Sequence, residues 1–395
     1  SRLTPGVATL AFARMGRYTT EARTPEDLMQ YPQHNPLPIP ASGEFQHVKG
    51  TLDAVFDWHY ELKRTKLLDL YEKGKANTWN ATDLAWDTEV DIEKMVSQRQ
   101  QMGGGGMINK LLAPPRPLSD REALTLNLNM NAFMLSQFLH GEQGALLATA
   151  KIVETVPWAE AKFYAANQVA DEARHVEVYH RYLTEKLGVS YEIHPSLATL
   201  LADIMKDSRW DVTYLGMQIM VEGLALAAFG LQKMMMAEEP LIVDITTRIM
   251  ADESRHVAFG VLSLEEVCKN YTASELRERE DFVMEATHLM RERLLMQPVF
   301  ERLGWPADVW VPWAQNTPFM KGFRQMLFSK IVPNLKRLGL LTPRVREMYG
   351  KLDLLRFEHM KDSVEDPEVM PPQELVQLLM QFLATPPQES ATAAS

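Results

Sequence analysis

Two short motifs in the sequence place an acid and an imidazole at helical spacing. Residues 171–175 read Asp-Glu-Ala-Arg-His and residues 252–256 read Asp-Glu-Ser-Arg-His, so that a Glu-x-x-His occurs twice, 81 residues apart. Residues three apart share one face of a helix, so each pair can aim a carboxylate and an imidazole at one point. One such pair is common on solvated helices, whereas two copies inside apolar segments predict metal ligands. The pairs are Glu172 with His175 and Glu253 with His256.

A single glutamate precedes each motif by about thirty residues. Glu142 lies 30 residues before Glu172, and Glu222 lies 31 residues before Glu253. Both stand in otherwise apolar runs, and a carboxylate in an apolar interior is costly unless it is paired or binds a metal. The repeated order, Glu and then Glu-x-x-His, is the ligand set of four-helix bundles that hold two iron or manganese ions.

Four carboxylates and two imidazoles that meet in a bundle core can hold two divalent ions. Four negative charges offset those of two Fe²⁺ ions, which eases the desolvation of the acids, and imidazole is a suitable ligand for iron. The alternative, six residues in ordinary ion pairs and on solvated faces, does not account for the duplicated spacing. The predicted ligands are Glu142, Glu172 and His175 for one metal and Glu222, Glu253 and His256 for the other, with Glu172 and Glu253 as bridges.

The composition is that of a soluble globular protein. Of 395 residues, 46% are hydrophobic and 24% are charged, and the net charge of −11 argues against nucleic acid or an anionic membrane as a partner. The single cysteine, Cys268, excludes an internal disulfide and a cysteine-based zinc site and suits a reducing compartment, so we expect a cytoplasmic protein. The first residues lack the apolar core of a signal peptide, and no uncharged apolar run of about 18 residues predicts a membrane span.

Helical periodicity and capping signals predict four long helices around the ligands. Ser119 and Glu122 have the spacing of a capping box, Pro157 and Pro240 suit first helical turns, and Gly188 suits a helix end. No strand pattern is convincing, so the predicted fold class is all-α, a four-helix bundle with additional N- and C-terminal helices. The four predicted core helices are 120–155, 157–187, 207–238 and 240–270.

The remaining segments are predicted to surround this core. Loops are expected at 77–86 and 304–313. Further helices are expected at 51–75, 272–297, 317–339, 343–361 and 372–384. The predicted organisation is an N-terminal arm and helices packed on the bundle (1–118), a di-metal four-helix core (119–271), additional C-terminal helices (272–384) and a disordered tail (385–395).

On these residues the chain resembles the ferritin-like carboxylate-bridged di-iron oxygenase superfamily. Its members include soluble acyl-carrier-protein desaturases, multicomponent monooxygenase hydroxylases and ribonucleotide reductase small subunits. The resemblance covers roughly 120–270, and the doubled Asp-Glu-x-Arg-His looks most like the hydroxylases. It implies that an aspartate orients each ligand histidine and that an arginine balances the charge. The implied residues are Asp171 for His256 and Asp252 for His175, with Arg174 and Arg255.

Three positions of this chain can be compared with functional residues of particular members of the superfamily. The position of the threonine found in many hydroxylases, one turn after the third-helix glutamate, is Leu226. The third histidine of the para-aminobenzoate N-oxygenases, seven residues before the last ligand, corresponds to Ile249, which weakens N-oxygenation of an aromatic amine. Tyr179, four residues after His175, has the offset of the radical tyrosine of ribonucleotide reductase small subunits, although a tyrosine one turn from a ligand is more often simply packed.

The resemblance implies an O₂-dependent di-iron oxidase or oxygenase. It would hydroxylate or desaturate a small or acyl-type organic substrate in an apolar pocket, with two Fe ions or an Mn/Fe pair. An external electron donor, a ferredoxin or flavin reductase, and a homodimer are expected by analogy. A radical-generating subunit is the second hypothesis. Iron storage or a structural bundle is the third, and the helices expected beyond residue 272 weigh against it, because ferritins are much shorter chains.

Overall fold

The four core helices predicted from the sequence are present in the computed structural model, which describes residues 48–50, 52–58, 60–91, 94 and 113–366. All regular elements among these residues are helical, which confirms the all-α fold class. The described residues belong to one compact unit, Val48–Ser395. The predicted arm up to residue 47, the helix over 372–384 and the tail over 385–395 lie outside the described residues.

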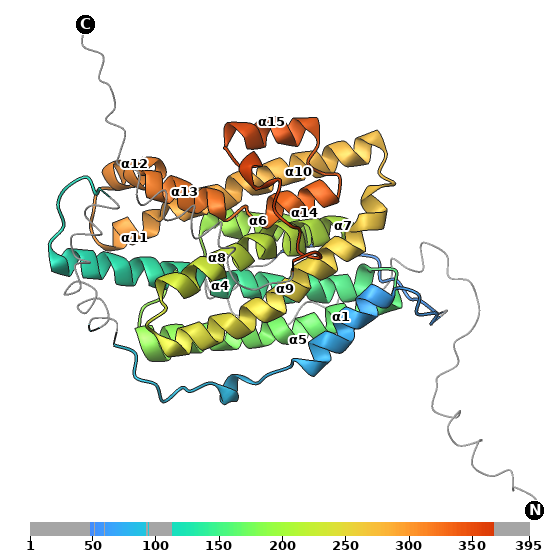
Figure 1. The fold of residues 1–395 in the computed structure, drawn as a ribbon, viewed down its shortest axis with the longest axis horizontal. Coiled ribbons are helices and arrows are strands. Elements are labelled where there is room, and N and C mark those ends of the chain that lie inside the picture. The colour runs from blue at the N-terminus through green and yellow to red at the C-terminus, as the bar shows by residue number, and fades with distance from the viewer. Residues whose placement is uncertain (1–47, 51, 59, 92–93, 95–112, 367–395) are drawn as a thin grey trace, which may run out of the picture. The chain divides into compact units, whose positions relative to one another are not determined.

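The core consists of four rods that lie side by side (Figure 1). The third rod is built from three elements that follow one another without a break: α7, a π-helical segment η6, and α8. The second rod likewise ends in a π-helical segment, η5. The bounds are α4 Asp120–Thr155, α5 Ala159–Tyr182, η5 Leu183–Leu187, α7 Trp210–Tyr214, η6 Leu215–Val221, α8 Glu222–Met235 and α9 Pro240–Cys268.

Local sequence sets where these rods begin and end. Ser119 accepts a hydrogen bond from the backbone N–H of Glu122, and the Glu122 side chain returns to Ser119, so the predicted capping box starts α4. Buried Glu239 caps α9 by accepting from the N–H groups of Leu241 and Ile242 at 2.8 and 2.7 Å. Gly188 ends η5 with a φ of 63°, in the left-handed region that favours glycine.

The π-helical segment η6 ends directly before Glu222. A π turn holds one residue more than an α turn, so it rotates every following side chain about the helix axis. The predicted uninterrupted helix over 207–238 is therefore wrong in this detail. The segment packs closely: a Cβ on Gly260 of α9 would meet the Cβ of Gln218 at 2.5 Å.

Further helices cover the bundle. In Figure 1 α10, α14 and α15 lie above it, and α10 contacts α6 and η6. An apolar cluster separate from the main core includes Phe133, Phe300 and Trp310. It joins α11 and α12 to the first half of α4. The bounds are α6 Pro195–Lys206, α10 Ala273–Glu292, η7 Arg293–Leu295, α11 Gln297–Arg302, α12 Ala307–Asn316, α13 Pro318–Met326, α14 Ile331–Arg337, α15 Pro343–Lys351 and η8 Leu355–Phe357.

Two C-terminal predictions are corrected. The loop expected at 304–313 is largely helical, because Trp310 and Ala314, one turn apart, are buried and hold α12 together despite the internal Pro312. The single helix expected at 317–339 is two, α13 and α14. Pro333 is the third residue of α14, where a backbone N–H would lack a helical partner in any case. The helix expected at 343–361 ends at Lys351 and is followed by η8.

The helix predicted over 51–75 is also corrected, because only α1, Thr65–Ala76, is helical. The described residues before it, 52–58 and 60–64, are non-helical, and two of their N–H groups bond to other helices: that of Val55 donates to the carbonyl oxygen of Glu154 at 2.8 Å, and that of Arg64 to Oε1 of Glu160 at 2.8 Å. Large apolar side chains of this segment stay outside, with Phe56 and Trp58 each 69% exposed. An apolar face with helical spacing does not by itself produce a helix when no surface of the protein covers it.

Among the residues that the structure describes, one segment, Trp210–Lys233, is long and apolar enough to cross a membrane by length and composition. Its apolar window is 94% buried inside the protein, and it forms the third rod of the bundle. Burial in the core thus accounts for its composition.

Candidate metal centre

The six predicted ligands come together in the middle of the bundle. Each of the four rods contributes, and every one of these side chains is at most 5% exposed. This placement, one Glu from each of two rods and one Glu-x-x-His from each of the others, is the arrangement of ferritin-like di-metal bundles. The contributions are Glu142 from α4, Glu172 and His175 from α5, Glu222 from the start of α8, and Glu253 and His256 from α9.

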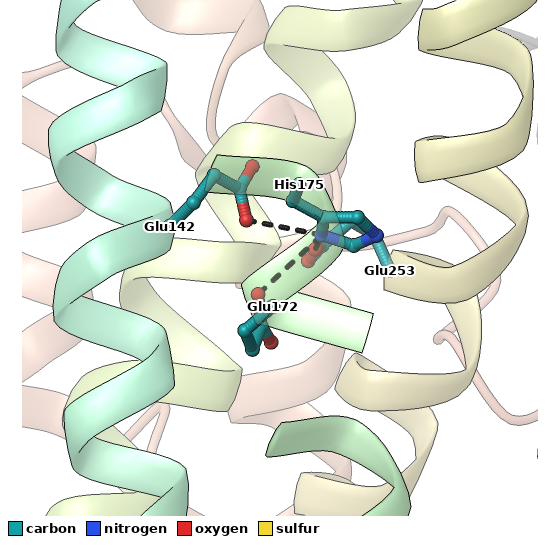
Figure 2. Close-up of side chains that lie close together, drawn as sticks. All are labelled: Glu142, Glu172, His175 and Glu253. Atoms are coloured by element: carbon teal, nitrogen blue, oxygen red, sulfur yellow. Dashed lines mark hydrogen bonds and ion pairs between the residues drawn. The ribbon is translucent and has the colours of Figure 1, made fainter. Parts of the chain in front are cut away.

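The first group of donors surrounds His175. Its Nδ1 lies 3.2 Å from Oε2 of Glu142, 3.4 Å from Oε2 of Glu172 and 3.3 Å from Oε1 of Glu253. Figure 2 shows these four side chains pointing toward one another. One donor atom from each lies within 4.8 Å of the others, which is close enough to share one metal ion.

The second group surrounds His256. Its Nδ1 lies 3.2 Å from Oε1 of Glu172, and Glu222 completes a set whose donors lie within 4.8 Å of one another. Glu172 therefore belongs to both groups and turns one oxygen to each imidazole. Oε1 of Glu253 lies between the imidazoles, 3.3 Å from His175 and 3.4 Å from His256. Glu253 was predicted as a ligand of the second metal and as a bridge, and its donor atom groups with those of Glu142, Glu172 and His175.

An aspartate of the opposite motif faces each imidazole. Nε2 of His175 lies 3.2 Å from Oδ2 of Asp252, and Nε2 of His256 lies 3.3 Å from Oδ2 of Asp171. The crossed contacts have the pairing that the resemblance implied. A proton on Nε2 that is donated to the aspartate leaves Nδ1 available for a metal. Two arginines contact these aspartates: Arg174 contacts Asp171, and Arg255 contacts Asp252.

Crowded charges perturb these groups in the metal-free protein. Burial, reinforced by the charge of Glu253, raises the pKa of Glu142 and of Glu222 well above the usual value. Burial alone would lower the pKa of His175, but the carboxylate of Glu142 and the bond to Asp252 raise it well above normal. Glu142 and Glu222 therefore resist ionisation unless additional positive charge is present.

Whether metal ions fit this centre can be judged from its buried polar atoms that lack a hydrogen-bond partner. Oε2 of Glu172, Oε2 of Glu222, both oxygens of Glu253 and Nδ1 of His256 are buried and have no hydrogen-bond partner. Buried polar atoms are nearly always paired, so this concentration in one place needs an explanation. All five atoms belong to the predicted ligands. Their chemistry, carboxylate oxygens with imidazole nitrogens, fits two divalent transition-metal ions.

Three side chains make polar contacts to the cluster that were not expected from the sequence. Nε1 of Trp79, in the segment predicted as a loop, donates to Oδ2 of Asp252 at 2.8 Å. The side-chain amide of Asn167 donates to Oδ2 of Asp171 at 3.1 Å. Gln168 donates to two of the ligand glutamates. The sequence signal that could have revealed the contacts of Gln168 is its own position, a polar amide one turn before Glu172 on the same helix face.

Tyr179 is completely buried one turn after His175, and its hydroxyl has no hydrogen-bond partner. Its ring packs with Phe138 and Phe229, at centroid distances of 6.0 and 6.1 Å. Burial and the charge of Glu142 raise the pKa of Tyr179 well above normal, so it stays protonated. These three rings make the surroundings of the Glu142 side of the centre aromatic and apolar.

A surface pocket of about 400 Å³ lies elsewhere, where α5 and α7 begin and α9 meets α10. Trp158, Trp210, Asp211 and Arg279 are among its lining residues. None of the six ligands lines it.

The family comparison covers the whole centre. A family model described as "Protein of unknown function (DUF455)" matches residues 71–302, more than half of the chain. The chain belongs to this family. The DUF455 match runs from within α1 to the end of α11 and includes all six ligands and both aspartates. A comparison with curated proteins gave no match.

Several solved structures are similar to this DUF455 chain. A mutant R2-like ligand-binding oxidase with an anaerobically reconstituted Mn/Fe cofactor is 15% identical over 71% of this chain and 98% of its own, with a TM-score of 0.45. Another mutant is 16% identical over the same shares, with a TM-score of 0.43. The oxidase with an aerobically reconstituted Mn/Fe cofactor (long soak) is 15% identical over 83% and 93%, with a TM-score of 0.37.

Proposed function

We propose that this protein is an O₂-dependent oxidoreductase with two metal ions at the centre described above. The observation that carries the proposal is the convergence of six buried side chains from four rods, four of which have buried donor atoms without a hydrogen-bond partner. The favoured metals are two Fe ions, and an Mn/Fe pair fits the same donors. When bound, such a pair supplies the redox chemistry that activates O₂.

The protein's own residues would prepare this chemistry. Glu172 joins the two positions because its oxygens face different imidazoles. Asp252 and Asp171 fix the orientation of the two imidazoles and raise their basicity. The complete burial of His175 and His256 keeps bulk water away from the reacting centre.

The substrate is proposed to be a small or acyl-type organic molecule. Phe138, Tyr179 and Phe229 place apolar surface beside the Glu142 side, which suits a substrate with an unactivated C–H bond. Hydroxylation and desaturation both begin with removal of a hydrogen atom from such a bond, so one site serves either. A ferredoxin or flavin reductase would supply electrons, and a homodimer is the proposed assembly.

Metal counting and O₂ uptake together test this proposal. The metal-free protein is loaded anaerobically with Fe²⁺, desalted, analysed for metal and then exposed to O₂ with a reductant. We expect two ions per chain and O₂ consumption. Glu172→Ala and His256→Ala should abolish both, whereas Glu177→Ala and His180→Ala, at exposed positions of α5, should leave both unchanged. An active, metal-free Glu172→Ala protein would contradict the proposal, and uptake far beyond two ions per chain would favour iron storage.

Radical generation for a partner reductase is the second candidate, because the Tyr179 hydroxyl is buried, protonated and unpaired near Glu142. It predicts a stable tyrosyl signal in electron paramagnetic resonance after the loaded protein meets O₂. The signal should vanish in Tyr179→Phe and persist in Tyr182→Phe. N-oxygenation of an aromatic amine is less favoured, since the buried side chain at 249 is an isoleucine that cannot bind a metal.

A further inference from the structure

One glutamine contacts two of the ligands at once. Gln168 of α5 is completely buried, and its Nε2 lies 2.9 Å from Oε1 of Glu172 and 2.9 Å from Oε1 of Glu222. An amide nitrogen carries two hydrogens, so each carboxylate receives one. The reverse orientation of the amide would set its oxygen against two carboxylates. Gln168 thus ties α5 to the first residue of α8.

The other end of this amide has no partner. Oε1 of Gln168 is buried without a hydrogen bond, and an unpaired acceptor in the interior costs about 1–3 kcal/mol. An aliphatic side chain of similar volume would fill the position without this cost. The bonds that Nε2 makes to the two carboxylates, rather than packing, therefore explain a glutamine here.

The second half of the centre has no counterpart to this amide. Gln168 stands four residues before Glu172, and the residue four before Glu253 is Ile249. Ile249 is as completely buried as Gln168. The two halves agree in Glu, Glu-x-x-His, aspartate and arginine, but they differ at this position. The two metal positions are therefore chemically different, although their ligand types match.

The bond from Gln168 also makes the two oxygens of Glu222 different. Oε1 takes the bond from Gln168, and Oε2 is buried without a partner, available to a metal. In Glu172 the tied atom is Oε1, the oxygen that lies 3.2 Å from Nδ1 of His256. Both bonds from Gln168 therefore act on the group around His256. Among the described residues, no side-chain amide bonds to Glu142.

We propose that Gln168 is a positioning residue for the metal position made by Glu172, Glu222 and His256. Its amide holds Glu222 as a ligand through Oε2 alone and prevents this carboxylate from swinging to chelate or bridge. Carboxylate movement in the centre then falls to Glu142. The inference rests on the proposed di-metal function. Groups that orient metal ligands change metal affinity by about 10–100-fold, and here the effect is confined to one of two positions.

Gln168→Met tests the proposal, with Ile249→Met as the matched control. Methionine has a volume close to both side chains and cannot donate a hydrogen bond. Metal-free proteins are titrated anaerobically with Mn²⁺, the bound metal is counted, and anomalous diffraction locates each ion. We expect wild type and Ile249→Met to keep two ions. Gln168→Met should keep the ion at Glu142 and His175 and bind at Glu222 and His256 about 10–100-fold more weakly.

The outcomes separate this inference from the function on which it rests. Two ions bound with unchanged affinities in Gln168→Met, or equal weakening at both positions, would overturn the role of Gln168 and leave the di-metal centre standing. A wild-type protein that takes up no metal would contradict the proposed function itself. If Gln168→Met does not fold, the structure of the Mn²⁺-loaded wild type decides. Oε1 of Glu222 should remain bonded to Gln168, and chelation through both oxygens would overturn the inference.

Discussion

Nε2 of His175 lies 3.2 Å from Oδ2 of Asp252, so an imidazole of the first motif is oriented by an acid of the second. The reciprocal pair, His256 with Asp171, has a distance of 3.3 Å. The two motifs thus complete each other across the bundle.

Asp252→Asn and Asp171→Asn should weaken metal retention. The amide keeps the shape of the side chain but removes the negative charge that raises the basicity of the imidazole, so we expect about 10–100-fold lower metal affinity. Competition with a chelator measures this change. Asp244→Asn, which alters an exposed ion pair with Arg248 on the same helix, is the control and should retain metal normally. Wild-type affinity in both variants would show that the crossed aspartates have no role in binding.

Trp79→Phe should destabilise the metal-free protein. The phenyl ring keeps most of the packing, but Asp252 loses the hydrogen bond from Nε1 in a buried position. We expect the free energy of unfolding to fall by about 1–3 kcal/mol, as measured by urea denaturation. Faster metal release should accompany this loss. In Trp86→Phe, which loses a bond to the backbone oxygen of Ala81, metal release should not change, and equal release from both variants would refute the specific role of Trp79.

Stability of the metal-free protein should fall as the pH rises. Burial raises the pKa of Glu142 and of Glu222 above the usual 4.5, so the folded state holds these protons more tightly than the unfolded state. Burial opposes but does not cancel the carboxylates that raise the pKa of His175 and of His256 above 6.5. The raised pKa values of the two glutamates and of the two histidines act in the same direction. They stabilise the folded state at low pH, and this stabilisation is lost as the pH rises from about 4.5 upward through the raised pKa values.

Metal should reverse this trend, because binding requires deprotonated ligands and releases protons. Thermal melts from pH 5 to 8 with and without Mn²⁺ should therefore show a metal-dependent gain in Tm that grows with pH. Glu142→Gln/Glu222→Gln should flatten the pH dependence of the metal-free protein. A gain in Tm that is constant across this range would contradict the predicted protonation of the centre.

Gly260→Ala should destabilise the contact between α9 and η6. The new Cβ would meet the Cβ of Gln218 at 2.5 Å, so the rods must separate locally, at an expected cost of about 1–3 kcal/mol in chemical denaturation. Gly141→Ala is the matched control, because a Cβ there meets nothing within 4 Å. It should stabilise α4 by about 0.5–1 kcal/mol. Similar effects of the two substitutions would mean that α9 and η6 are not in close contact.

The core helices and the pairing of candidate ligands on each helix could be predicted from the sequence, because both depend on local regularities. Spacing on a helix face placed His175 beside Glu172, and the capping box at Ser119 marked the start of α4. Neither signal reports on tertiary contacts. The bond from Gln168 to Glu222 joins residues 54 positions apart, and no local pattern encodes such a pair.

The missed elements have the same cause. The helix α12 forms in spite of Pro312 because Trp310 finds a buried place against Phe300. The π-helical segment before Glu222 packs closely on Gly260, and the spacing of apolar residues along the chain does not report such a contact. The apolar residues around Phe56 have helical spacing but no surface to cover them among the described residues, so periodicity overestimated the helix there.

The crossing of acids and imidazoles has a consequence for how the chain could be divided. A cut between α6 and α7 would give one fragment with His175 but without Asp252, and another with His256 but without Asp171. Neither fragment could assemble a properly oriented imidazole by itself. Mixed together, the fragments should regain both pairs, so that reassembly and metal uptake would become a single event.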